Sequence, residues 1–365
     1  MKRLIAGTAA ALLAAVFLLP CQAMAISAER AIVMDACTGR VLYEKNADER
    51  SLIASTTKIM TALIVCEQCN VLDRMQIPKE AVNIEGSSMY LKEGEVLTVQ
   101  ELLYGLMLHS GNDAAVALAI YCGGTVEGFV GLMNDKARQL ELENTHFENP
   151  NGLDVPAHYS TARDLAVLAA YAMENPIFAK TVSVKNISVG NRYLHNHNKL
   201  LWQVEGAEGV KTGFTKKAGR ILVSSASRDG RRLIAVTIRD PDDWQDHKEL
   251  LDRGFSDFSH NQIIEKGQVL GRVSVFGGTE DYVDVIADED FSYALMLNEV
   301  PEILLAKPDF VYAPVVEHES AGYAYVCLGD TVIGKVPVRY SKTIEQQRMP
   351  ETSFWQRWFG DNQND

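Results

Sequence analysis

A serine and a lysine three residues apart place the strongest constraint on this chain. The stretch Ser55-Thr56-Thr57-Lys58 precedes apolar residues whose spacing predicts the buried face of a helix, namely Ile59, Met60, Leu63 and Ile64. Residues three apart on a helix share one face, so we expect the Ser55 hydroxyl within proton-transfer reach of the Lys58 amine. Partial desolvation favours a neutral lysine that can accept the proton. The pair therefore predicts a serine nucleophile activated without histidine.

A serine at the start of a helix is often only an N-cap, so the Ser55–Lys58 pair by itself does not indicate catalysis. Two further motifs strengthen the catalytic interpretation. Ser110-Gly111-Asn112 follows an apolar run and opens a helix expected over residues 113–120, and Lys211-Thr212-Gly213 precedes a strand expected over 221–225. The patterns S-x-x-K, S-D-N and K-T-G occur together in class A β-lactamases and penicillin-binding proteins. Here Gly111 replaces the aspartate of the middle motif. The three motifs in order predict a serine acyl-transferase.

The chemistry of acyl transfer assigns a role to each motif. We expect Ser55 to attack a carbonyl carbon, Lys58 to take its proton, and Ser110 to relay that proton to the departing amine, while Asn112 binds the substrate amide. The backbone N–H groups of Ser55 and of a residue on the strand after the third motif would stabilise the oxyanion. The third motif supplies substrate-binding residues: Lys211 and Thr212 for a terminal carboxylate, and Gly213 to leave room for a peptide beside the strand.

The chain resembles the low-molecular-mass penicillin-binding proteins that act as D-alanyl-D-alanine carboxypeptidases. The resemblance extends to several other segments, at residues 35–43, 86–91, 151–154, 160–164 and 196–201. It implies an α/β (α+β) serine acyl-transferase domain of the penicillin-binding protein/β-lactamase type, followed by a small all-β sandwich domain. It also implies a peptidoglycan stem peptide as substrate, covalent reaction with β-lactams, and no cofactor or metal.

One departure from the family concerns the substrate carboxylate. Some members carry an arginine after the last strand of the catalytic domain that helps to bind this group, and here the region reads Asp242-Asp243-Trp244-Gln245-Asp246-His247. Arg239 and His247 are the nearest basic candidates. Three alternatives stay open: a β-lactamase, a D,D-endopeptidase, and a catalytically silent wall-binding protein. The intact Ser55, Lys58 and Ser110 count against the silent binder, and the appended β domain counts against the lactamase.

The termini predict export and attachment. Lys2 and Arg3 precede an apolar run and Ala23-Met24-Ala25, so residues 1–25 are expected to be a signal peptide cleaved after Ala25, with the enzyme on the outer face of the cytoplasmic membrane or in the cell wall. The tail, residues 346–365, carries four aromatic residues on one face of an expected short helix: Phe354, Trp355, Trp358 and Phe359. It is interpreted as an amphipathic membrane anchor, and the alternative is packing against the β domain.

The net charge and the cysteine content argue against a nucleic-acid partner, a redox motif and a metal site. Without Lys2 and Arg3, 33 of the 35 basic residues stand against 48 acidic ones, a charge of about −15 that argues against a nucleic-acid partner. Five cysteines follow the signal peptide: Cys37, Cys66, Cys69, Cys122 and Cys327. The Cys66-x-x-Cys69 spacing is that of redox motifs, but no thioredoxin-like pattern or further metal ligand accompanies it. We expect apolar packing for Cys66 and an odd count of thiols.

The hydrophobic periodicity of the sequence divides the rest of the chain into two parts. Residues 26–258 mix strands with helices, including helices expected over 98–108, where Thr98 and Glu101 form a capping box, and 161–173. A hairpin is expected through Asp229-Gly230. Residues 259–345 lose helical periodicity and read as short strands, which predicts a β-sandwich. These strands are expected over 269–276, 282–286, 291–297, 323–328 and 332–338.

Overall fold

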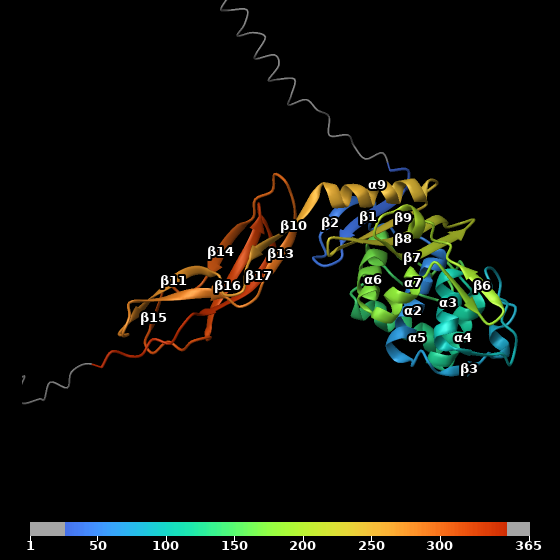
Figure 1. Cartoon of the computed structure of the whole chain (residues 1–365), viewed down its shortest axis with the longest axis horizontal. Coiled ribbons are helices and arrows are strands. Elements are labelled where there is room, and N and C mark those ends of the chain that lie inside the picture. The colour runs from blue at the N-terminus through green and yellow to red at the C-terminus, as the bar shows by residue number, and fades with distance from the viewer. Residues whose placement is uncertain (1–25, 349–365) are drawn as a thin grey trace, which may run out of the picture. The chain divides into compact units, whose positions relative to one another are not determined.

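The computed structural model describes residues 26–348, which divide into two compact units (Figure 1). The first unit comprises residues 26–36 and 41–252, and the second comprises residues 37–40 and 253–348. The expected signal peptide and all but the first three residues of the expected tail lie outside the described residues.

An antiparallel sheet of five strands organises the first unit. The order is β2 (Val41–Lys45), β1 (Arg30–Asp35), β9 (Arg231–Ile238), β8 (Gly219–Arg228) and β7 (Ala207–Thr215). The predicted hairpin joins β8 to β9 with Arg228 opposite Arg231. Asp229 and Gly230 both have positive φ, as a tight two-residue turn between twisted strands requires, so this prediction is confirmed.

Helices cover both faces of this sheet. In Figure 1, α9 (Asp243–Ser256) lies on one face and the other main helices gather on the opposite side. These are α2 (Lys58–Gln68), α3 (Val99–Leu108), α4 (Asn112–Gly123), α5 (Val126–Gln139), α6 (Ala162–Glu174) and α7 (Pro176–Ser183). Within the described residues, no single helix has both the length and the apolarity to cross a bilayer, and α4 and α5 satisfy that test only jointly, as a pair bent by 84°.

Local signals place most of these helices where the sequence predicts. Thr98 caps α3, and its capping box with Glu101 is complete; Thr161 caps α6 by accepting a hydrogen bond from the backbone N–H of Asp164. The sequence analysis missed α7, whose first residue is Pro176 and whose cap is Asn175. The shorter elements are η1 (Ala54–Thr57), β3 (Arg74–Gln76), η2 (Lys79–Ala81), β4 (Val96–Thr98), β5 (Asn186–Val189), β6 (Arg192–His195) and α8 (Leu200–Gln203).

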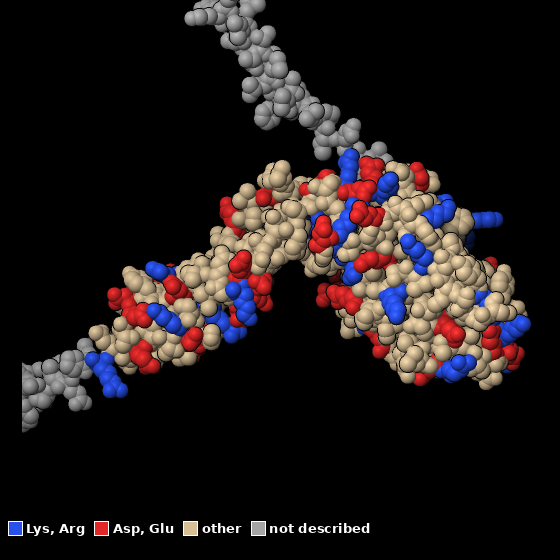
Figure 2. All heavy atoms as spheres, in the orientation of Figure 1, with Lys and Arg blue, Asp and Glu red and all other residues tan. Residues whose placement is uncertain are grey.

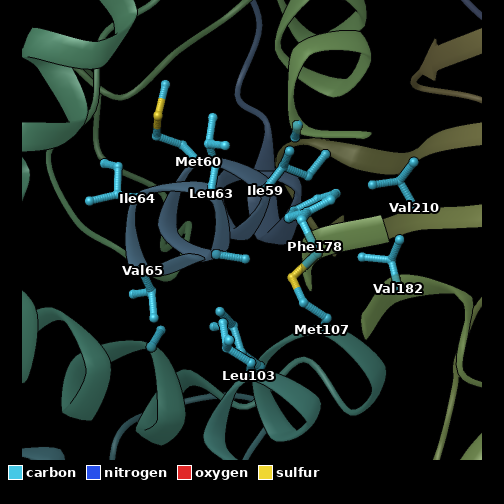
Figure 3. Close-up of a cluster of buried hydrophobic side chains, with 14 of the residues drawn as sticks. Ile59, Met60, Leu63, Ile64, Val65, Leu103, Met107, Phe178, Val182 and Val210 are labelled. Carbon is cyan, nitrogen blue, oxygen red and sulfur yellow. The ribbon is translucent and has the colours of Figure 1, made fainter. Parts of the chain in front are cut away.

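Helix α2 runs through the middle of the helical layer. Every residue from Lys58 to Cys66 is buried, so this helix packs on all sides rather than along one stripe. Figure 3 shows its apolar side chains among residues of α3, α7 and β7, including Leu103, Phe178 and Val210. The core therefore fixes the N-terminus of α2, where Lys58 lies, relative to the sheet.

The surface of the first unit carries mixed charge. Figure 2 shows acidic and basic side chains interspersed over its visible face. Several of them form ion pairs, such as Arg232 with Glu208 at 2.8 Å and Arg192 with Glu95 at 2.6 Å. These two pairs are partly buried, with 15–29% of each side chain accessible. Ion pairs that remain in contact with solvent contribute little to stability, so we expect the fold to depend mainly on its core.

Apart from the last four residues of α9, the described residues of the second unit contain strands and no helix. A six-stranded sheet runs in the order β14 (Glu302–Ala306), β16 (Ser320–Leu328), β17 (Thr331–Tyr340), β12 (Tyr282–Ala287), β11 (Val269–Phe276) and β15 (Phe310–Tyr312). A separate pair joins β10 (Phe258–Ile264) to β13 (Phe291–Met296). Ile264 of that pair shares a core with Val273 and Val338 of the sheet. The five predicted strands are present, and β10, β14 and β15 were missed.

We expect the burial of α2 to dominate the stability of the first unit. Leu63→Ala removes a fully buried side chain from the middle of α2 and should lower the free energy of unfolding by about 2–5 kcal/mol in urea denaturation. The same substitution at the exposed Leu72 should change it by no more than about 0.5 kcal/mol. Equal effects at the two positions would contradict this account of the core.

Candidate active site

Ser55 and Lys58 meet as their spacing predicts. Ser55 lies in the short 3-10 turn η1, which runs directly into α2, and Lys58 is the first residue of α2. Lys58 Nζ lies 2.9 Å from Ser55 Oγ, 2.7 Å from Asn112 Oδ1 and 2.6 Å from the backbone O of Asn151. A neutral amine has two hydrogens and one lone pair. Donation to Asn112 and Asn151 therefore leaves the lone pair for the Ser55 hydroxyl.

The surroundings of Lys58 favour that neutral form. The side chain is fully buried, and burial lowers its pKa well below the usual value, with a further contribution from the charge of Lys211. The carboxylate of Asp113 acts in the opposite direction but has the smallest effect of the three. Lys58 is thus an amine that can accept a proton rather than a permanent ammonium.

Glycine allows the chain to close around this pair. Gly152 has a φ of +87°, and a Cβ at this position would lie 1.9 Å from the backbone O of Ala54, the residue before Ser55. Any side chain would therefore push the loop away from η1. The same loop carries Asn151, whose carbonyl accepts from Lys58, so Gly152 is needed for the position of this acceptor.

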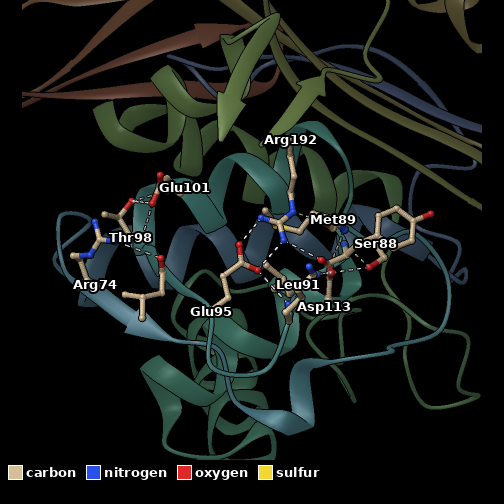
Figure 4. A network of polar contacts seen from close by, with 12 residues as sticks. Arg74, Ser88, Met89, Leu91, Glu95, Thr98, Glu101, Asp113 and Arg192 are labelled. Atoms are coloured by element: carbon tan, nitrogen blue, oxygen red, sulfur yellow. Dashed lines mark hydrogen bonds and ion pairs between the residues drawn. The ribbon is translucent and has the colours of Figure 1, made fainter. Parts of the chain in front are cut away.

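The second motif is held by a polar network around Asp113 (Figure 4). The Asp113 carboxylate accepts hydrogen bonds from the Ser88 hydroxyl at 2.6 Å and from the backbone N–H groups of Met89 and Leu91, both at 3.1 Å. Arg192 contacts the same loop by donating two hydrogen bonds to the Glu95 carboxylate. The network fixes the loop over residues 85–95 against the start of α4.

Ser110 and Asn112 occupy different places in this arrangement. Ser110 lines the cleft above Ser55 and has a φ of +61°, an uncommon backbone conformation for a residue with a side chain. Asn112 is buried below, where its Oδ1 accepts from Lys58 and its Nδ2 donates to the backbone O of Glu85 at 2.5 Å. Both polar atoms of Asn112 are thus engaged within the protein, and its direct role in the structure is to orient Lys58.

The third motif lies on β7, beside the turn η1 that carries Ser55. Gly213 approaches so closely that a Cβ would lie 3.2 Å from the backbone O of Ile53 and 3.3 Å from the backbone N of Thr56. Thr212 lines the cleft, whereas Lys211 is buried and its Nζ donates to the backbone O of Thr212 at 2.8 Å. Burial lowers the pKa of Lys211 to about 7.

A cleft of about 450 Å³ opens over these groups. It is lined by residues of all three motifs together with residues of β8 and α9: Ser55, Ser87, Ser110, His197, Thr212, Gly213, Phe214, Arg220, Asp243 and Trp244. Within residues 26–348, no group of three or more His, Cys, Asp or Glu side chains is arranged to hold a metal ion. The cleft brings together the Ser55 hydroxyl, the Ser110 hydroxyl and the cationic side chain of Arg220.

The structure places neither basic candidate for the substrate carboxylate in this cleft. His247 is fully buried between Ser224 and Thr237, and Arg239 bonds the backbone O of Lys217 outside the cleft. Arg220 of β8 lines the cleft instead, with its Nε donating to Asp243 at 3.1 Å. The sequence analysis missed Arg220, which the β7–β8 register sets opposite Phe214.

His158 is a second residue that the sequence analysis did not identify. Its Nδ1 accepts from the backbone N–H of Glu148 at 3.0 Å, so its Nε2 carries the proton and donates to Thr57 Oγ1 at 2.7 Å. Thr57 in turn donates to the backbone O of Ala54 at 2.8 Å. Burial lowers the pKa of His158 to about 4. The neutral imidazole thus supports the turn on which Ser55 lies.

Two family models match the chain. The model described as D-alanyl-D-alanine carboxypeptidase matches residues 19–242, and the model described as penicillin-binding protein 5, C-terminal domain, matches residues 258–346.

Individual relatives match along most of the chain. D-alanyl-D-alanine carboxypeptidase DacF of Bacillus subtilis is 31% identical over 355 residues, covering 93% of this chain and 90% of that protein. DacD of Escherichia coli is 35% identical over 312 residues, covering 80% of each. The crystal structure of penicillin-binding protein 5 from Haemophilus influenzae superposes with a TM-score of 0.77 at 29% identity, covering 88% of this chain and 98% of that one.

The buried His158 predicts an acid-dependent loss of stability. Its pKa is lowered to about 4 in the folded protein against 6.5 for an ordinary histidine, so the unfolded chain binds the proton more readily and stability falls as pH drops below 6.5. Between about pH 7 and pH 5 this group should remove about 2 kcal/mol of unfolding free energy. His158→Gln keeps a donor and an acceptor but does not titrate, so its loss over the same interval should be smaller by that amount. An unchanged pH dependence in urea denaturation would contradict the assignment.

Proposed function

Because this chain belongs to the D-alanyl-D-alanine carboxypeptidase family of serine peptidases, we propose that Ser55 is the residue that forms its acyl-enzyme. The chain is a serine-type D-Ala-D-Ala carboxypeptidase that acts on peptidoglycan stem peptides and is acylated by penicillin. Its first unit has the penicillin-binding protein/β-lactamase fold, and its second is the all-β domain that follows in penicillin-binding protein 5. The placement of Lys58 Nζ, buried and 2.9 Å from Ser55 Oγ, carries the proposal.

In the proposed acylation, Ser55 Oγ attacks the carbonyl carbon of the last peptide bond while Lys58 accepts the hydroxyl proton. Ser110 lines the cleft beside Ser55 and relays a proton to the departing amine of D-alanine. The backbone N–H groups of Ser55 and Phe214 stabilise the oxyanion. Water then hydrolyses the acyl-enzyme, with the same lysine accepting a proton from the water.

Binding of the substrate carboxylate is proposed to involve Lys211, Thr212 and Arg220. Thr212 and Arg220 line the cleft, and Asp243 holds the guanidinium of Arg220 in place. The pKa of Lys211, lowered to about 7 by burial, rises when an anion binds beside it. A charged Lys211 lowers the pKa of Lys58 in turn. Binding of a C-terminal carboxylate therefore favours the neutral base that the next step needs.

We also propose the expected export, domain division and membrane attachment. Residues 1–25 act as a signal peptide, residues 26–258 as the catalytic domain, residues 259–345 as the β domain, and residues 346–365 as a tail that attaches to the membrane surface. The Ala23-Met24-Ala25 site supports the proposed signal peptide, and the four aromatic residues of the tail support the proposed membrane attachment. The division into units near residue 252 supports the middle boundary.

Penicillin labelling tests the nucleophile. Ser55→Ala should abolish the covalent adduct seen by mass spectrometry of the intact protein, because it removes the hydroxyl that lies 2.9 Å from the Lys58 amine. Loss of one half-buried hydroxyl should cost only about 1 kcal/mol of stability. Ser183→Ala, which removes an exposed serine hydroxyl from the end of α7, should label like the native protein. An adduct on the Ser55→Ala variant would refute the assignment, and rapid loss of the native adduct would favour a β-lactamase.

Peptides with acid and amide termini test the carboxylate site. Lys211→Ala and Arg220→Ala should each lower kcat/KM for a D-Ala-D-Ala peptide by about 10–100-fold, the usual effect of losing a charged hydrogen bond. Lys216→Ala, at an exposed position in the turn after β7, is the matched control and should have little effect. The native enzyme should cleave the amidated peptide poorly. Equal cleavage of acid and amide would favour an endopeptidase.

Liposome co-sedimentation tests the tail. The mature protein should sediment with vesicles, and a version that ends at Glu351 should remain in the supernatant, because it lacks all four aromatic residues of the expected anchor. Binding should be weak on anionic lipid, since Asp361 and Asp365 flank those residues. Equal sedimentation of the two versions would contradict the hypothesis that the tail is a membrane anchor.

A further inference from the structure

The fold brings together two cysteines that are about 50 residues apart in the sequence. Cys69 follows the last residue of α2, and Cys122 lies in the last turn of α4. The Cys122 thiol donates a hydrogen bond to the sulfur of Cys69, and Cys122 Sγ also lies 3.7 Å from Gln68 Oε1. Both thiols are partly exposed, so a small reagent can reach them.

The third cysteine nearby does not join them. Cys66 points into the core from α2, and burial raises its pKa to about 12, so it stays a protonated thiol. The Cys66-x-x-Cys69 spacing in the sequence therefore does not describe the pairing in the fold. The hydrogen bond from Cys122 lowers the pKa of Cys69, which makes Cys69 the better nucleophile of the hydrogen-bonded pair.

We propose that Cys69 and Cys122 form a disulfide that joins the C-terminal ends of α2 and α4. The two thiols are hydrogen-bonded, and Cys122 Sγ lies 3.7 Å from the side chain of Gln68, the residue before Cys69. A disulfide requires the two sulfurs to approach to about 2 Å. The oxidant is a small-molecule or protein disulfide. The Cys69 thiolate attacks one sulfur of it, forming a mixed disulfide and releasing one thiolate. Cys122, as its thiolate, then attacks Cys69 Sγ, and the second thiol of the oxidant leaves; two protein thiols are oxidised and one disulfide is reduced.

The bond would join the two helices that carry the first two catalytic motifs. Lys58 begins α2 and Asn112 begins α4, and these residues are hydrogen-bonded to each other. The 11 residues of α2 place the disulfide about 16 Å from Lys58 along the helix. The bond therefore holds the helix pair together at the end opposite the reaction, without touching the catalytic groups. It should raise resistance to unfolding and leave acylation at moderate temperature unchanged.

Treatment of the whole protein with oxidised glutathione, followed by iodoacetamide and mass spectrometry under non-reducing conditions, tests the proposal. We expect two fewer reactive thiols than in the reduced protein and a cross-linked tryptic peptide containing Cys69 and Cys122. Loss of penicillin labelling on heating should shift upward by about 5–10 °C on oxidation. Dithiothreitol should reverse both changes.

Matched variants identify the pair. Cys66→Ala should leave the cross-link and the thermal shift intact, whereas Cys69→Ser and Cys122→Ser should each abolish both. A cross-link from Cys66, or one that persists in the Cys69→Ser or Cys122→Ser variant, would overturn the proposal. An unchanged thiol count after oxidation would overturn it as well. The thiol count and the cross-linked peptide do not depend on Ser55 being the nucleophile, because neither readout needs activity.

Discussion

The geometry of the active site depends on one buried amine. Lys58 Nζ is held by Asn112 Oδ1 and the backbone O of Asn151, and these two acceptors account for both hydrogens of a neutral amine. The remaining lone pair faces Ser55. A charged lysine buried here would lose the hydration of its ammonium without a paired carboxylate in direct contact. Burial in the fold therefore lowers the pKa of the amine on which the proposed nucleophilic attack depends.

Several segments that are far apart in the sequence hold the surroundings of the Lys58 amine in place. Gly152 allows the Asn151 loop to close on η1, His158 supports the Thr57 turn from below, and Asp113 fixes the loop over residues 85–95 against the start of α4. Each of these contacts joins residues that are at least 20 apart in the chain. The site is thus a product of the whole first unit, and the burial of α2 is what allows these contacts to have a fixed geometry.

The two cationic groups near the cleft have different physical roles. Lys211 is buried and its pKa is lowered to about 7, so its charge responds to what binds beside it. Arg220 keeps its charge, because its ion pair with Asp243 raises its pKa further. In the proposed mechanism, the permanent charge of Arg220 attracts the substrate carboxylate, and the charge of Lys211 responds to the arrival of this carboxylate and lowers the pKa of Lys58. The proposed cleft would thereby couple recognition to activation.

The sequence by itself determined what depends on short-range spacing. The Ser55–Lys58 pair, the capping box of α3, the β8–β9 hairpin and the alternating strands of the second unit follow from local periodicity, and the three ordered motifs identified the enzyme class. Tertiary structure alone decided which distant groups meet. It brought Asn112 to Lys58, buried His247, placed Arg220 beside the motifs, and set Cys122 in hydrogen-bond contact with Cys69. Such contacts depend on how the helices pack on the sheet, and no local pattern of residues encodes that packing.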